Sequence, residues 1–157
     1  MLRGGNWDKN MSARKIQVFL YGSAINLDVL VKAGLKKRAF APASLAGFDL
    51  LIQPVANIEE SGDGIVFGIL ANFTHVEIDE LLNSHTPMLT KAAYSPEPVI
   101  VRTRGGKIVP ALTYMADEMT KGTATQEYIN RILKPAKSYG FPSWYLERIE
   151  SFRPKSS

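Results

Sequence analysis

The chain has 157 residues, of which 45% are hydrophobic and 22% charged, as is typical of one globular domain. Its formal net charge is +4, but the basic residues are scattered and no nucleic-acid motif accompanies them, so we expect no nucleic-acid partner. No apolar run approaches the roughly 20 residues that span a bilayer, and the absence of cysteine excludes disulfides and thiol catalysis.

The expected organisation is a single domain over residues 14–152, with a flexible extension at 1–13 and a short tail at 153–157. The first ten residues lack the apolar segment of a secretory signal. A chain without cysteine suits a reducing compartment, so we expect a cytoplasmic protein. The sequence predicts no oligomeric state.

The first predicted strand, Ile16–Tyr21, is apolar and runs directly into Gly22-Ser23. Asn26 is a candidate N-cap for a helix that ends near Gly34. A buried strand that ends in such a turn leaves backbone amides in need of an acceptor, and beside a helix N-terminus they favour an anion. The segment from Tyr21 to Asn26 is therefore a candidate site for a small carboxylate-bearing molecule. The alternative is an ordinary turn between a strand and a helix.

Two further strands are predicted, at residues 43–52 and 64–71. Gly47 indicates a bulge in the first of them, and the polar segment Asn57–Gly64 is typical of a loop. The sequence Thr74-His75-Val76-Glu77 fits a capping box, which predicts that a helix begins there. His85 falls on the same face of this helix as the apolar Ile78 and Leu81.

The second half of the chain is punctuated by prolines, so residues 94–97 are expected to be irregular or to form a sheet edge. Strands at 99–103 and 107–115 are predicted to form a hairpin at Gly105-Gly106. A second capping box at Thr123-x-x-Gln126 predicts a helix that kinks or ends at Pro135. A last helix is expected from Pro142-Ser143 to about Ile149. This order of elements predicts an α+β domain with a mixed or antiparallel sheet.

Five sequence features together resemble the γ-glutamylcyclotransferase-like family, over roughly residues 16–149. In chain order they are Tyr21-Gly22-Ser23 with Asn26; Gly47-Phe48; Gly64–Leu70 leading into Thr74 and an acidic helix; Ala111-Leu112-Thr113-Tyr114; and the segment Tyr128–Tyr145 with its ending Tyr139-Gly140-Phe141-Pro142-Ser143-Trp144-Tyr145. The resemblance implies a small mixed β-barrel flanked by helices, with a pocket at the Tyr-Gly-Ser loop.

The resemblance also implies a reaction. Family members with this activity cyclise a γ-glutamyl amide to 5-oxoproline and a free amine, without a cofactor or metal. The α-amine attacks the γ-carbonyl within one molecule, so positioning supplies much of the rate. The amides of Gly22, Ser23 and Ala24 are then expected to hold the α-carboxylate of a γ-glutamyl or amino-acid-like ligand.

The family's general base is a glutamate in a Leu-Asp-x-x-Glu-Gly pattern after the acidic helix. This chain has Leu82 at the aspartate, His85 at the glutamate and Thr86 at the glycine. A neutral imidazole can accept a proton near pH 7. Three roles for His85 therefore remain open: a general base, a polar contact in a binding pocket, or a structural histidine. Glutamates elsewhere, at 77, 80 and 97, are alternative bases.

The remaining candidates are ligand contacts. Tyr114 stands at a family position whose hydroxyl faces the pocket, and Tyr21 and Tyr94 are interpreted in the same way; the alternative for each is an aromatic core residue. Ser23 is interpreted as a loop residue and not as a nucleophile. With two histidines and no cysteine, we expect no metal site of that kind.

Three functional classes follow from these observations. The first is a γ-glutamylcyclotransferase-like enzyme with His85 in place of the glutamate. The second is a non-catalytic pocket for a small amino-acid-like or carboxylate ligand. The third is a protein of this shape with a closed pocket and a role in interaction.

Overall fold

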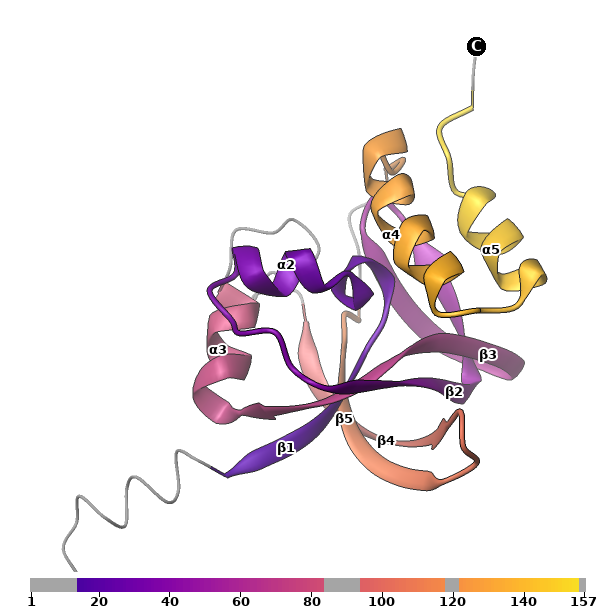
Figure 1. Cartoon of the computed structure of the whole chain (residues 1–157). Helices are drawn as coiled ribbons and strands as arrows, with labels where there is room; N and C mark the ends of the chain where they lie inside the picture. Colours follow the sequence, from indigo (N-terminus) through magenta and orange to yellow (C-terminus); the bar gives the residue numbers. More distant parts are fainter. Residues whose placement is uncertain (1–13, 84–93, 118–121, 156–157) are drawn as a thin grey trace, which may run out of the picture.

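The computed structural model describes residues 14–83, 94–117 and 122–155, and its centre is a closed barrel of five strands (Figure 1). The expected extension at 1–13 and His85 lie outside the described residues. The strands are β1 (Lys15–Leu20), β2 (Phe40–Ile52), β3 (Ala56–Thr74), β4 (Ser95–Thr103) and β5 (Ile108–Met115). The helices are η1 (Gly22–Ile25), α2 (Leu27–Lys32), α3 (His75–Asn83), α4 (Gln126–Ser138) and α5 (Ser143–Glu150).

The strands follow one another around the barrel in the order β1-β3-β2-β4-β5. Neighbouring strands are antiparallel, except that β1 runs parallel to β5, with Val18 opposite Leu112. The sheet is therefore mixed, and the expected α+β barrel flanked by helices is confirmed. Among the described residues, no helix is long and apolar enough to cross a membrane.

The long hairpin of β2 and β3 corrects one prediction and confirms another. The polar segment Asn57–Gly64 is not a loop, because it lies within β3, and its residues 57–60 pair with residues 48–51 of β2. For residues 57–60, pairing with β2 outweighs the low intrinsic strand preference of the polar side chains. The predicted bulge is present: the register of β2 against β3 shifts between Ala46 and Phe48, where Gly47 has φ +88°.

Helix α5 lies where it was predicted, but helix α4 differs from the prediction. The N-cap of α4 is Thr125, whose hydroxyl accepts from the Tyr128 amide, and not Thr123. The helix does not end at Pro135 but continues to Ser138. Helix α5 covers one edge of β2, since Nη2 of Arg148 donates to the Leu50 carbonyl at 3.0 Å. This contact protects an edge that the short pairing of β2 with β4 leaves open.

Candidate functional site

The loop after β1 folds into the short helix η1, and Gly22 is the residue that allows this. Its φ is +63°, a conformation that side chains disfavour. A Cβ at this position would lie 2.4 Å from Cβ of Ala56, at the start of β3. The backbone of the loop therefore packs directly against β3, which buries residues 21–25 completely or nearly so.

Helix α4 supports the loop from behind through two tyrosines. The Tyr128 hydroxyl accepts from the Ala56 amide at 2.9 Å, and the Tyr139 hydroxyl donates to the Ile25 carbonyl at 2.8 Å. Burial raises the pKa of Tyr128 to about 12, although the amides of Ala56 and Ser23 lower it in part. Tyr128 thus stays a neutral phenol that satisfies buried backbone donors.

Ser23 is fully buried beside Tyr128 and does not line the cavity described below. Its backbone amide and its hydroxyl both lie close enough to the Tyr128 oxygen to stabilise the phenolate. The Ser23 hydroxyl nevertheless makes no hydrogen bond of ordinary geometry within the described residues. The serine is therefore a buried polar residue between the loop and α4.

Asn26 joins the loop to α4 and has two roles. Its Oδ1 accepts from the Asp28 amide at 3.0 Å and caps α2, as predicted. Its Nδ2 donates to the Arg131 carbonyl at 3.1 Å. In a regular α-helix that carbonyl would accept from the amide of residue 135. Because residue 135 is a proline, it has no amide to donate, and the carbonyl is left for Asn26.

A small cavity lies beside the loop, on the face opposite α4, where β1, β5 and α3 meet it. Its described walls are mostly apolar and consist of Phe19, Leu20, Tyr21, Ala24, Ala56, Leu81, Leu82, Tyr94 and Tyr114. Its volume is about 20 Å³, which is enough for one water molecule. Among the described lining residues there is no carboxylate and no imidazole.

Three tyrosines supply the polar groups of this cavity, and two of them are already engaged. The Tyr21 hydroxyl donates to the Tyr114 carbonyl at 2.6 Å, and the Tyr94 hydroxyl donates to the Ala56 carbonyl. The Tyr114 hydroxyl makes no hydrogen bond among the described residues, although the residue as a whole is only 7% exposed. Burial raises the pKa of all three phenols, so they are neutral donors and not bases.

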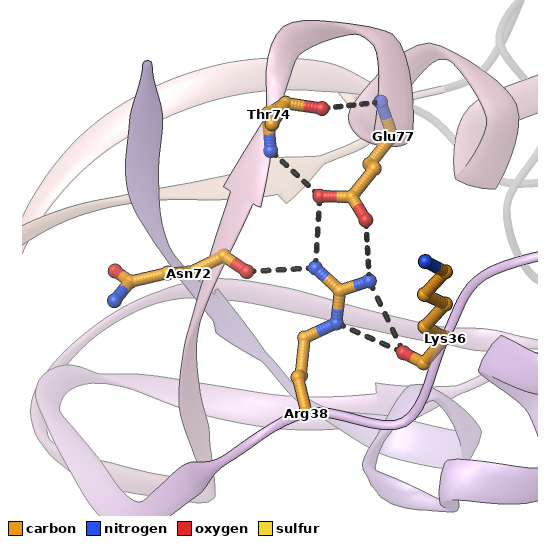
Figure 2. A network of polar contacts seen from close by, with 5 residues as sticks. All are labelled: Lys36, Arg38, Asn72, Thr74 and Glu77. Carbon is orange, nitrogen blue, oxygen red and sulfur yellow. Dashed lines mark hydrogen bonds and ion pairs between the residues drawn. The ribbon is translucent and has the colours of Figure 1, made fainter. Parts of the chain in front are cut away.

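Helix α3 forms one wall of the cavity, and a charged network fixes its first turn to the end of β3 (Figure 2). The capping box predicted here is confirmed, since the Thr74 amide donates to Glu77 at 2.9 Å and the Glu77 amide donates to the Thr74 hydroxyl at 3.1 Å. Both carboxylate oxygens of Glu77 also accept from Arg38, at 2.9 and 2.6 Å. Arg38 lies 4.3 Å from the centre of the Phe73 ring and donates to the carbonyls of Lys36 and Asn72.

This network also decides how Glu77 behaves as an acid. Hydrogen bonding from Arg38, the largest effect, lowers the pKa of the Glu77 carboxyl to about 2. A carboxylate that binds protons so weakly is a poor general base near neutral pH. Glu80 and Glu97 are exposed and do not line the cavity, so none of the three alternative glutamates stands at this site.

Comparison with known structures identifies the fold. Comparison of sequences does not, because no protein-family model and no curated protein matches the chain. A γ-glutamyl cyclotransferase superposes with a TM-score of 0.74 at 21% identity, covering 92% of this chain and 91% of that one. The chain has the γ-glutamylcyclotransferase-like fold. An uncharacterised protein from Homo sapiens gives a TM-score of 0.72 at 20% identity, covering 91% of this chain and 90% of that one. A yeast γ-glutamyl cyclotransferase specific to glutathione gives 0.58 at 12% identity, over 88% and 97%.

Within this fold the sequence-predicted site residues separate into groups. Tyr21, Ala24, Tyr94 and Tyr114 lie together around the cavity. Gly22, Ser23 and Asn26 lie behind it, in the loop and its junction with α4.

Sequence reasoning missed Ala56, whose two backbone groups bind two tyrosine hydroxyls, and it assigned no site role to Tyr128. The signal for Tyr128 was its place on the buried face of a helix, because a buried phenol needs a hydrogen-bond partner.

Proposed function

We propose that this chain binds a γ-glutamyl amide at the loop Tyr21–Asn26 and cyclises it to 5-oxoproline and a free amine. The observation that carries this proposal is the fold, which superposes on a γ-glutamyl cyclotransferase over 92% of the chain. Four residues that the resemblance indicated, Tyr21, Ala24, Tyr94 and Tyr114, also line one cavity.

In the proposed reaction the α-amine of the substrate attacks its own γ-carbonyl carbon. A new C–N bond closes a five-membered ring, the original amide C–N bond breaks, and the leaving amine takes up a proton. The base that removes the proton from the attacking amine is proposed to be His85. Holding both groups in one short molecule lowers the entropic part of the barrier.

The other proposed roles fall on residues around the cavity. Of the three loop amides that the resemblance indicated, only that of Ala24 belongs to a residue that lines the described cavity, and it is proposed to hold the α-carboxylate of the substrate. Tyr114 lines the cavity and its hydroxyl has no hydrogen-bond partner among the described residues, so we assign it the hydrogen bond to the developing oxyanion. The hydroxyls of Tyr21 and Tyr94 already donate hydrogen bonds to backbone carbonyls, so these two residues are proposed to shape the walls of the cavity.

A second function, ligand binding without turnover, is favoured by one specific observation. The described wall of the cavity carries neutral phenols and apolar side chains but no ionisable base. Against it, the volume of about 20 Å³ is far below the roughly 300 Å³ at which small-molecule sites begin. A pocket of this kind would bind an amino-acid-like ligand only if its walls separate.

The deciding experiment measures 5-oxoproline by mass spectrometry after the purified protein meets a panel of γ-glutamyl dipeptides and γ-glutamyl amines. The His85→Ala substitution is expected to lower turnover by about 10²–10⁴-fold, the usual contribution of a general base. His75→Ala is the matched control, because it removes the other histidine from an exposed position on α3. It is expected to leave turnover unchanged.

The outcomes separate the candidates. Product that persists in the His85→Ala variant keeps the enzyme and rejects His85 as its base. No product from any substrate, together with a rise in melting temperature on adding one of them, supports the non-catalytic pocket. No product and no thermal shift rejects both, and leaves a protein of this shape with a role in interaction.

A further inference from the structure

We propose that the groove between the β2–β4 seam and the turn joining α4 to α5 is a second binding site, for a small organic anion with an aromatic ring. The groove is lined by Pro42, Ala43, Ser44, Phe67, Arg102, Thr103, Arg104, Gly140, Phe141 and Pro142. It shares no lining residue with the cavity at the Tyr21 loop, so this proposal does not depend on the proposed function.

The size of the groove suits one aromatic ring with a short charged substituent. Its volume is about 200 Å³, ten times that of the cavity at the loop, and engineered cavities of about 150 Å³ bind benzene. Its floor offers the rings of Phe67 and Phe141, with centroids 5.7 Å apart and planes inclined by 39°. Aromatic ligands pack well in such a setting, edge-on or offset against the rings.

The groove is held in shape by hydrogen bonds on both sides. The Arg104 amide donates to the Pro42 carbonyl at 3.1 Å and ties the end of β4 to β2. On the other side, the Tyr145 hydroxyl donates to the Phe67 carbonyl at 3.2 Å, while the Tyr145 ring lies 5.0 Å from that of Phe67. A site with fixed walls loses little entropy when a ligand binds.

The charge of the rim selects an anion. Arg102 and Arg104 both line the groove, and none of its described lining residues is acidic. Arg104 uses Nη2 to bind the Tyr139 carbonyl, which anchors this side chain next to the helical turn. Arg102 is exposed, and its guanidinium makes no hydrogen bond or ion pair within the described residues. A guanidinium with free donors beside an aromatic floor matches a carboxylate attached to a ring, because it can bind both oxygens.

The test compares phenylacetate with phenylacetamide, which has the same shape but no charge, in titrations of the full chain followed by ¹H–¹⁵N NMR. Phenylacetate is expected to shift the amides of Thr103, Gly140 and Phe141 saturably, and to bind at least tenfold more tightly than the amide. Arg102→Gln is expected to lower the affinity for phenylacetate by about tenfold, because one charge-assisted contact is lost. Lys107→Gln is the matched control, because it removes a positive charge from the same hairpin outside the groove.

Arg102→Lys distinguishes geometry from charge, and is expected to bind with an affinity between those of wild type and Arg102→Gln. The proposal is overturned if phenylacetamide binds as tightly as phenylacetate. It is also overturned if Lys107→Gln weakens binding as much as Arg102→Gln, or if the shifts appear around Tyr21 instead of the groove. Because Arg102 is exposed, its variants are expected to fold as wild type does, and a preserved spectrum of each variant verifies this directly.

Discussion

At the scale of single residues, the loop at the candidate site is built on close backbone approach. Gly22 combines a positive φ of +63° with a neighbour only 2.4 Å from where a Cβ would stand. Those are two separate penalties for any side chain at this position. Elsewhere in the chain Gly34 carries the first penalty alone, since its φ is +90° but nothing lies within 4 Å of its Cβ position.

This contrast gives a prediction for glycine substitutions. Gly34→Ala is expected to lower the free energy of unfolding by about 1–2 kcal/mol, the cost of the left-handed backbone. Gly22→Ala is expected to cost a further 1–3 kcal/mol or so, because it also overpacks the contact with Ala56. Urea denaturation of both variants measures the difference. Equal losses would mean that the loop yields to the added methyl group without cost.

The residue scale also shows what the sequence can and cannot predict about the site. Tyr21 and Tyr114 were found because a motif marks them, and they do meet, hydroxyl to carbonyl. Ala56 was invisible because its contribution comes from its backbone amide and carbonyl, which every residue possesses. Backbone groups of a small apolar residue leave no trace in a side-chain pattern.

At the scale of elements, α3 depends on a clamp formed by two side chains from different segments. Arg38 comes from the connection between α2 and β2, and Glu77 from the first turn of α3. Their side chains are 12% and 25% exposed, so the pair is only partly screened by solvent. Because Leu81 and Leu82 follow one turn later and line the cavity, the clamp also sets the position of that wall.

The clamp predicts how stability depends on pH. The Glu77 carboxyl has a pKa lowered from 4.5 to about 2 in the folded protein. Its stabilising contribution is therefore complete above about pH 4.5 and is lost as the pH falls towards 2. At pH 7, Glu77→Gln is expected to lower the free energy of unfolding by on the order of 1–2 kcal/mol, a value reduced for solvent screening.

Denaturation curves between pH 7 and pH 2 check this. The difference in free energy of unfolding between wild type and Glu77→Gln should narrow as the pH falls from about 4.5 towards 2. Wild type loses the Glu77 charge over this range, whereas glutamine never carries it. Glu80→Gln, an exposed change on the same helix, should run parallel to wild type. A constant gap across the range would show that the charge of Glu77 contributes nothing, and that the capping hydrogen bonds are all that matters.

The elements themselves were largely predictable where a local rule fixes them. The capping box at Thr74, the hairpin at Gly105-Gly106 and the bulge at Gly47 are each encoded within a few residues, and each is present. The strand at residues 57–60 was missed because its partner, residues 48–51 of β2, is what makes it a strand. Pairing between strands is a tertiary effect that local composition does not reveal.

At the scale of the whole molecule, the contact between Asn26 and Arg131 joins segments 105 residues apart. Pro135 makes this contact favourable, because its missing amide leaves the Arg131 carbonyl without its usual helical donor. The effects of Asn26 and Pro135 on the free energy of unfolding are therefore expected to be coupled, although the two residues lie in different halves of the chain.

A double-mutant cycle tests this coupling. Asn26→Ala alone loses the α2 cap and leaves the Arg131 carbonyl unsatisfied, which is expected to cost about 1.5–3 kcal/mol. In the Pro135→Ala background the new amide can satisfy that carbonyl, so Asn26→Ala is expected to cost about 1 kcal/mol less. Unfolding free energies of the four proteins give the coupling. A coupling near zero would mean that the carbonyl does not distinguish between its two donors.

The barrel itself was predictable from the order of motifs, and not from any physical rule about closure. Strand patterns alone indicated a mixed or antiparallel sheet. The pairing that closes the ring, β1 parallel to β5, rests on a contact between Val18 and Leu112, and no local signal announces it. Resemblance supplied the architecture, and the structural likeness to known γ-glutamyl cyclotransferases agrees with it.

The loop after β1 makes contacts with residues that are distant in sequence, and this has a consequence for how the protein folds during synthesis on the ribosome. Tyr21 finds its acceptor 93 residues later, and Ile25 receives its hydrogen bond from a tyrosine 114 residues later. A nascent chain that has emerged as far as β4 carries the loop but none of these partners. Because domains of this contact pattern cannot close early, the loop takes its final form only when α4 has been translated.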